Sequence, residues 1–421
     1  MINPELFLLS PIAIQNSIEK AQWVDIQPLN NITLAPIEFS IPKCQEYLDL
    51  SQTFLYLNTK ITKADGTAYA KDAKDSDVTF VNNAMHSMFS NIILTLNDET
   101  IDSSPDNNYP YKAIMPLLVG GNEQNLKGIL LHTGFIKDDA GKMDDVTNSA
   151  IAKRKEWTAA GAEKEFFGRL SIDLFQQQRY LINGIDLKLK LVRSKNEFAL
   201  FHTGSEKPKI VIKEAILYVR KCKINPEIEM EHAFGLSKQL NAQYPIQHTE
   251  VLSTTIASGS AGHRADNLFY GKVPKTIILG MVSNDAYNAS YAKNPFNFQH
   301  FNLNSLRLLL NGDEIPFQPF TPDFATKKCL KEYMSLYQSL GDSDRTLAIS
   351  YDEWLNGYTL FVFNLSPDLS NNPQFHANLM NMRLDMKFSQ ALAAPITLLL
   401  HATFDANIFV NENRNVFTDF K

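Results

Sequence analysis

Nine histidines make a metal or nucleophile site the first possibility to test in this 421-residue sequence. His132 and His202 each begin a His-Thr-Gly tripeptide, but neither is followed by a second histidine at the spacing of a ligand pair. The sequence contains no HxH pair, no HExxH and no GxSxG. The segment 259–262 (GSAG), with Gly271 and Lys272 further on, lacks the spacing and the Ser/Thr of a phosphate-binding loop. We therefore expect no catalytic residue, no cofactor and no metal, and the chain is predicted not to be an enzyme.

Two further residue groups could bind a metal, and neither has the required pattern. Asp138, Asp139, Asp144 and Asp145 are close in sequence, but they lack the alternating ligands and the final glutamate of a calcium loop. We interpret them as part of a solvated loop over 137–158. The cysteines Cys44, Cys222 and Cys329 are far apart, which predicts reduced thiols rather than a zinc site or a disulfide framework.

Composition points to a globular protein made largely of strands. Hydrophobic residues make up 44% and charged residues 20%, and the chain has 27 Phe and 15 Tyr. The net charge is −6, and residues 1–30 carry one lysine, Lys20, and no arginine. A basic arm that binds nucleic acid is therefore not expected. We also expect no signal peptide and no membrane span, and hence synthesis and assembly inside a cell.

Strand patterns recur along the whole chain and resemble each other at an offset of 214 residues. Asn91–Ile101 (NIILTLNDETI) and Ser305–Ile315 (SLRLLLNGDEI) both read as a strand, a tight turn and the start of a second strand. A predicted helix follows each, within Tyr109–Val119 and over Lys327–Leu340. For the second helix we expect one apolar face, formed by Leu330, Tyr333, Met334, Tyr337 and Leu340.

The later segments repeat in the same order. Gly168–Phe175 pairs with Leu360–Leu369 as a strand running into Asp-Leu, and Asn183–Val192 pairs with Asn381–Ser389. Each half then ends in a long strand region, Lys209–Ile224 and Pro395–Val410. This duplication predicts an all-β protein with two tandem eight-stranded jelly-roll sandwiches and short helices in the insertions between strands. The expected division is an N-terminal segment 1–30, a first jelly roll 31–224, a partly helical linker 225–241 and a second jelly roll 242–421.

Several of these segments resemble a known family of viral proteins. Pro36–Ile61, Asp173–Ser194 (DLFQQQRYLINGIDLKLKLVRS), Asn294–Asn302 (NPFNFQHFN) and Arg414–Phe420 are similar to motifs of the major capsid proteins of Polinton/Maverick- and adintovirus-like double-stranded DNA viruses. The resemblance runs in order over nearly the whole chain. It implies a double jelly-roll subunit of the virion and pseudo-hexagonal homotrimers that contact neighbouring capsomers. It also implies an icosahedral shell around double-stranded DNA, without sequence-specific binding, and a separate single jelly-roll penton protein.

Apolar residues near the two ends of the chain are the predicted assembly contacts, because apolar termini of a soluble protein need a surface to pack against. They are Leu6, Phe7, Leu8, Trp23, Phe417 and Phe420. Packing against their own domain is the competing interpretation. Three other functions stay open: a carbohydrate- or receptor-binding jelly-roll protein, a two-domain glycan hydrolase with a carboxylate pair, and a minor capsid or penton protein. The first requires an exposed aromatic platform.

Overall fold

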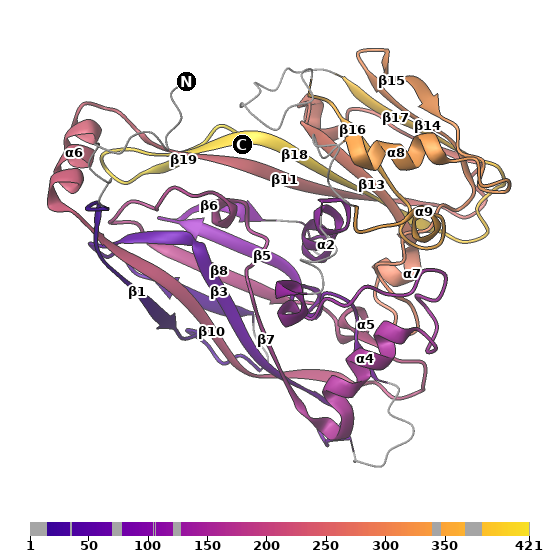
Figure 1. Ribbon diagram of the computed structural model, residues 1–421, viewed down its shortest axis with the longest axis horizontal. Coiled ribbons are helices and arrows are strands. Elements are labelled where there is room, and N and C mark those ends of the chain that lie inside the picture. The colour runs from indigo at the N-terminus through magenta and orange to yellow at the C-terminus, as the bar shows by residue number, and fades with distance from the viewer. Residues whose placement is uncertain are drawn as a thin grey trace, which may run out of the picture.

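The computed structural model describes residues 15–33, 36–69, 78–103, 105, 107–120, 128–338, 347–366 and 381–420. It consists mainly of strands, which form two sandwiches side by side (Figure 1). The strands of the first half are β1 (Ile18–Ile26), β2 (Ile37–Ile41), β3 (Tyr47–Thr62), β4 (Thr79–Phe80), β5 (Phe89–Leu96), β6 (Glu99–Ser103), β7 (Glu163–Gly168), β8 (Leu187–Arg193), β9 (Leu200–Phe201) and β10 (Lys209–Ile224).

The second half and the helices complete the element order. The strands are β11 (Ala242–Ile256), β12 (Gly262–Ala265), β13 (Thr276–Ser283), β14 (Leu303–Leu310), β15 (Asp313–Phe320), β16 (Leu360–Asn364), β17 (Met382–Phe388), β18 (Ile396–Val410) and β19 (Val416–Thr418). The α-helices are α1 (Ala84–Ser87), α2 (Tyr109–Gly120), α4 (Ser149–Thr158), α5 (Asn196–Ala199), α6 (Pro226–Ser237), α7 (Asn284–Tyr287), α8 (Leu330–Gln338) and α9 (Tyr351–Leu355). Single 3-10 turns are η2 (Ile129–Thr133), η3 (Ala159–Gly161), η4 (Asp173–Gln176) and η5 (Leu268–Gly271).

Each half contains two four-stranded antiparallel sheets with the same strand order. In the first half, sheet I is β1-β10-β3-β7 and sheet II is β2-β8-β5-β6. In the second half, sheet III is β11-β18-β13-β16, with β19 added beside β18, and sheet IV is β12-β17-β14-β15. When the eight principal strands of each half are counted in chain order, both halves read first-eighth-third-sixth and second-seventh-fourth-fifth. This is the order of a jelly roll, so the predicted pair of eight-stranded sandwiches is confirmed.

The repeated hairpins owe their turns to residues that tolerate positive φ. Asn97 and Asp98, between β5 and β6, have φ of 43° and 68°, and Asn311 and Gly312, between β14 and β15, have 50° and 100°. Two successive residues with positive φ form the turn whose twist matches that of the flanking strands. The first repeat match is therefore one structural hairpin present twice.

Two local predictions were wrong. Gly168–Phe175 is not a strand: β7 ends at Gly168, and η4 begins at Asp173, whose carboxylate is engaged by side chains from elsewhere in the fold. On α8, Leu330 and Met334 are exposed, while Glu332, Tyr333 and Leu336 are buried. Glu332 can lie inside because its carboxylate accepts a hydrogen bond from the Thr321 amide at 2.9 Å, which compensates part of the cost of burial.

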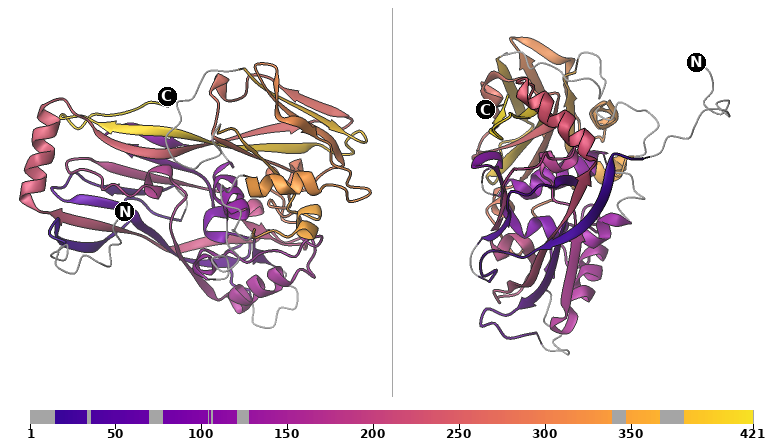
Figure 2. Two further views of the ribbon diagram at one scale, coloured as in Figure 1. Left: turned by 45° about the horizontal axis from the view of Figure 1, so that its top comes forward. Right: turned by 90° about the vertical axis from the view of Figure 1, so that its left-hand side faces the viewer.

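The chain passes from the first half to the second through α6. Asn225 caps this helix by accepting a hydrogen bond from the Glu227 amide, and Pro226 occupies the first turn, where its missing N–H costs nothing. Figure 2 shows α6 across the end of the molecule where β10 finishes and β11 starts. The start of the first sandwich lies earlier than expected, because Ile18–Ile26 pairs with β10 as a strand of sheet I. The expected boundary at residue 31 is therefore too late.

Candidate functional site

Strands β13 and β16 of sheet III are covered on both faces, which is unusual for an antiparallel sheet, whereas the edge strand β11 keeps several exposed residues. Every residue of β13 from Ile277 to Val282 is buried, and so is every residue of β16 from Leu360 to Phe363. One face packs on sheet IV inside the second sandwich, and the other lies against the first half, where α2 contacts β11 and β18 (Figure 1). The core of the second half consequently includes Tyr111, Ile114 and Leu118 of α2.

Polar contacts from the start of α2 tie it to the second half. The Asn108 side-chain amide donates a hydrogen bond to the Val251 carbonyl at 2.8 Å and accepts one from the Tyr287 hydroxyl at 3.0 Å. The fully buried Tyr111 donates its hydroxyl to the Pro295 carbonyl at 3.1 Å. These bonds satisfy groups that would otherwise be buried without a partner, so they fix how α2 lies on the sheet.

A buried ionic cluster, formed by Asp102, Lys112, Asp173 and His248, joins the two halves beside α2. The Lys112 ammonium lies 2.7 Å from an Asp102 oxygen and 2.8 Å from an Asp173 oxygen. The other Asp173 oxygen accepts hydrogen bonds from the Thr249 amide at 2.9 Å and interacts with His248 Nδ1 at 3.2 Å. Because Asp173 is in η4 of the first half and His248 is on β11 of the second, the cluster crosses the junction.

The electrostatics of the cluster favour the charged forms of Lys112, Asp173 and His248, whereas burial, together with the nearby Asp173 carboxylate, raises the pKa of Asp102. Burial by itself would lower the pKa of Lys112, but the two carboxylates outweigh it and raise this pKa above its ordinary value. Burial would raise the pKa of Asp173, but Lys112 and His248 hold it below the usual range. Burial would also lower the pKa of His248, but its contacts with Asp173 and Glu250 raise it to about 9. His248 is therefore a cation at neutral pH.

A second buried polar cluster fixes the insertion between β6 and β7. Arg154 of α4 donates to the Phe80 and Ile136 carbonyls and pairs with Asp138 at 2.6 Å. The same Asp138 carboxylate accepts a hydrogen bond from the Asn294 side chain at 3.0 Å, and Asn294 belongs to the second half. Arg154, Asp138 and Asn294 are each at most 3% exposed. This insertion therefore clamps the two sandwiches together.

The predicted exposed loop over 137–158 was only partly right: residues 141–147 are mostly exposed, but Asp138 is buried in the clamp. Its last part is helix α4, and the remaining acidic residues are used by protein donors. Asp139 accepts from the Ser149 amide at 2.7 Å, and Asp144 accepts from the Asn294 amide at 2.7 Å. Across the part of the chain that the structure describes, no three His, Cys, Asp or Glu residues gather as a metal site would require. In the same residues, no helix has the length and apolar character to span a membrane.

Sheet I, the counterpart of sheet III, has an open outer face. Along β3 the buried residues Leu55 and Leu57 alternate with more exposed ones, and no residue of β1 is buried. Every strand of the sheet contributes to a group of aromatic side chains on the open face, formed by Trp23, Phe54, Phe167 and Tyr218. We call these four residues the aromatic stripe. Trp23 is 50% and Phe167 42% exposed.

The four rings of the aromatic stripe form one connected group of ring contacts. Ring centroids are 5.7 Å apart for Trp23 and Phe54, 5.2 Å for Phe54 and Phe167, and 5.9 Å for Phe167 and Tyr218. Sequence reasoning selected only Trp23. The signal for the others was present, since Phe54 falls at a position of β3 where the period-2 pattern calls for a polar residue.

The remaining predicted contact residues do not gather at one place. Leu6, Phe7 and Leu8 lie outside the described residues. Phe417 on β19 is exposed and stacks on Phe409 at 5.3 Å. Phe420 stacks on His248 at 4.2 Å between centroids, so it packs beside the ionic cluster of its own chain. The cysteines are free thiols, buried at Cys222 and Cys329 and half-buried at Cys44.

Comparisons with known proteins agree with the strand order. A chain of the Sputnik virophage structure superposes with a TM-score of 0.67 at 13% identity, over 100% of this chain and 92% of that one. The Faustovirus major capsid protein gives a TM-score of 0.63 at 10% identity, over 95% and 92%. The fold is a double jelly roll.

The double jelly roll has a full-length relative in sequence as well. An uncharacterized protein of Caenorhabditis elegans is 26% identical over 420 residues, covering 96% of this chain and 98% of that protein. No protein-family model matches the chain. At identities of 10–13%, the solved structures establish the fold of this chain alone.

Proposed function

We propose that this chain is a major capsid protein, a structural subunit rather than an enzyme. It forms pseudo-hexagonal homotrimers, and these assemble an icosahedral shell around a double-stranded DNA genome. The observation that carries the proposal is the match of both sandwiches, in order and over nearly the full length, to the Faustovirus major capsid protein. The protein would then be located in the capsid of a virion that is assembled inside the host cell.

The junction between the sandwiches supports this role. Three chains with two similar sandwiches each supply six similar blocks, so one gene product can fill a hexagonal position. That arrangement requires the two sandwiches of a chain to keep a fixed orientation. The ionic cluster and the Arg154–Asp138–Asn294 clamp provide such a rigid connection, because both are buried and both bridge the halves.

The finer parts of the proposal rest on sequence motifs. The resemblance of Asp173–Ser194 and Asn294–Asn302 favours a Polinton- or adintovirus-like lineage. A single jelly-roll penton protein would be the partner at the five-fold vertices. Leu6, Phe7, Leu8, Trp23, Phe417 and Phe420 remain the proposed assembly contacts, with Phe420 also packing within its own chain.

Size-exclusion chromatography with light scattering, followed by negative-stain imaging, tests the proposed function. The purified full-length protein should have three times the subunit mass and a hexagonal outline, or should form shells. A monodisperse monomer at high concentration would contradict the proposal. Deletion of residues 1–14, which leaves β1 intact, should impair assembly; normal shells would remove the N-terminal residues from the contacts.

A carbohydrate- or receptor-binding jelly-roll protein is the second candidate, and one observation favours it. The aromatic stripe is an exposed aromatic platform of the kind that stacks on sugar rings. This candidate predicts a monomer that binds on a glycan array and loses binding with Trp23→Ala. The capsid proposal predicts a trimer whose stripe is inaccessible to glycans.

A further inference from the structure

The two halves share one strand order, but among the described residues strands β13 and β16 of sheet III are covered on both faces, whereas sheet I has an open outer face. We propose that the aromatic stripe on sheet I is covered by helix α8 of a second copy. That contact would repeat between subunits the one that α2 makes with sheet III inside each subunit. The inference rests on the proposed capsid function and specifies which surfaces form the trimer.

The position of α8 in the fold is the first argument. Helix α2 follows the β5–β6 hairpin, and α8 follows the equivalent β14–β15 hairpin. α2 buries its apolar side chains against the sheet of the other half. α8 packs on β16 through its buried face, but Leu330 is 61% and Met334 45% exposed. A helix with apolar side chains on both faces has one face without a partner in the isolated chain.

Charge is the second argument. Glu165 and Glu214 are exposed on the same face as the aromatic stripe, and both carboxylates act on Tyr56 of β3, raising its pKa to about 12, with the hydrogen bond from Tyr56 to Glu165 as the main cause. Lys327, Lys328 and Lys331 are exposed at the start of α8. The open face also carries Arg169, whose guanidinium lies 5.4 Å from the centroid of the Phe54 ring, so the complementary charge is limited to the side of the stripe where Glu165 and Glu214 lie. There the two carboxylates and the basic start of α8 suit each other across an interface.

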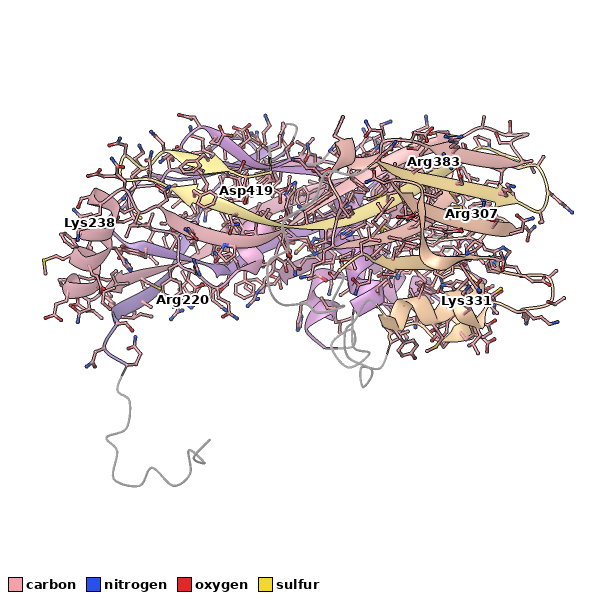
Figure 3. The ribbon with its side chains drawn as sticks, turned by 90° about the horizontal axis from the view of Figure 1, so that it is seen from above. Arg220, Lys238, Arg307, Lys331, Arg383 and Asp419 are labelled. Atoms are coloured by element: carbon pink, nitrogen blue, oxygen red, sulfur yellow. The ribbon has the colours of Figure 1, made fainter. Side chains whose placement is uncertain are left out.

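The two surfaces of one chain cannot meet each other. Figure 3 labels Arg220, the register partner of Trp23 on β10, and Lys331, the neighbour of Leu330, and they lie far apart along the molecule. The contact must therefore join two chains. Each chain contributes one stripe and one α8, so the contact is heterologous and can repeat around a ring until it closes. In such a ring, first-half and second-half sandwiches alternate.

Charge substitutions on the two surfaces test the inference by light scattering across a concentration series. Trp23→Glu, Phe167→Glu, Leu330→Glu and Met334→Glu should each weaken a contact roughly thirtyfold and shift the protein toward monomer. Tyr270→Glu is the matched control, since this aromatic residue is 88% exposed and lies outside both surfaces. It should leave the trimer intact. Circular dichroism should show that all five variants are folded, because each site is exposed.

Oxidative crosslinking identifies the partners directly. In a Cys44→Ser background, a chain with both Phe167→Cys and Met334→Cys should give covalent dimers and trimers, and a chain with either substitution alone should give neither. Crosslinking by Phe167→Cys alone would indicate a symmetric contact and overturn the inference. A wild-type trimer that tolerates all four glutamates would overturn it while leaving the capsid proposal standing. A wild-type monomer would contradict the capsid proposal itself.

Discussion

Sheets I and III are the same four strands of a jelly roll, yet their surfaces differ. In sheet III neighbouring residues of β13 are buried whichever face they occupy, whereas β3 of sheet I alternates between buried and half-buried positions from Thr53 to Ile61. The strand order is identical, so the difference comes from what lies on the outer face. The comparison teaches that a duplicated fold can indicate an intersubunit contact. Sheet III shows which kind of element covers this face, and sheet I has the same face without such an element in the single chain.

The largest effect on stability should come from removing the Lys112 ammonium, which anchors α2 where it packs on sheet III. Lys112→Met leaves Asp102 and Asp173 buried without their counter-ion, and we expect a loss of about 3–5 kcal/mol of unfolding free energy. Urea unfolding of the isolated subunit measures it. Lys188→Met is the control, because its pairs with Asp98 and Asp186 are solvent-exposed and should contribute far less to the unfolding free energy than the buried cluster does. Equal losses for both variants would show that the cluster does not secure the junction.

The next largest effect should be a difference between the two sheets in the unfolding free energy lost when neighbouring residues of one strand are replaced by alanine. On β13, Ile278→Ala and Leu279→Ala should each cost about 2–5 kcal/mol, because both faces are packed. On β3, Leu55→Ala should cost a similar amount, but its neighbour Phe54→Ala should cost only about 1 kcal/mol in a monomer. Urea titrations at a concentration below assembly measure all four. Alternating costs on β13 would mean that its outer face is not covered.

A smaller effect should be a change of the unfolding free energy with pH, caused by His248 at the junction between the two sandwiches. His248 has a folded pKa of about 9 and an ordinary value of 6.5, so its stabilisation is complete below about pH 6.5 and is lost as pH rises through about 9. The change should be on the order of 3 kcal/mol between pH 6 and pH 10. Thermal unfolding of the wild type and of His248→Gln would reveal it. Parallel pH profiles for the two proteins would argue against a charged His248.

The smallest effect on folding should come from Phe417. This side chain is exposed on β19, so Phe417→Ser should change the unfolding free energy by about 0.5 kcal/mol or less. If it is an assembly contact, as proposed, shell formation should decrease while the subunit stays folded. Urea unfolding and negative-stain counts of shells on the same preparation separate the two effects, and unchanged counts would exclude Phe417 from the contacts.

Much of the fold could be predicted from the sequence, because it depends on local patterns. Period-2 alternation is visible in strands such as β3, and the turns at Asn97-Asp98 and Asn311-Gly312 located the repeat. The continuous apolar run Leu360–Phe363 is typical of a strand packed on both faces, and the structure buries all four residues. These signals act over a few residues, so one chain is enough to recognise them.

The candidate site depends on contacts between residues that are far apart in the sequence. Such contacts could not be predicted from local patterns. Nothing near Asp138 and Arg154 indicated that Asn294 would complete their cluster, so the segment resembled a solvated loop. From the helical pattern alone, Glu332 would be a surface residue of α8. The amide that makes its burial possible is that of Thr321, which lies outside the helix. The aromatic stripe was missed because aromatic residues favour strands on either face.

Hydroxyl-radical footprinting of the free and the assembled protein tests the central comparison most directly. Our account predicts that oxidation of Trp23, Phe54, Phe167 and Tyr218 decreases strongly on assembly, while that of the exposed Tyr270 stays the same. Sheet I would then be as covered in the capsomer as sheet III is in the single chain. Unchanged oxidation of the aromatic stripe in assembled particles would contradict it.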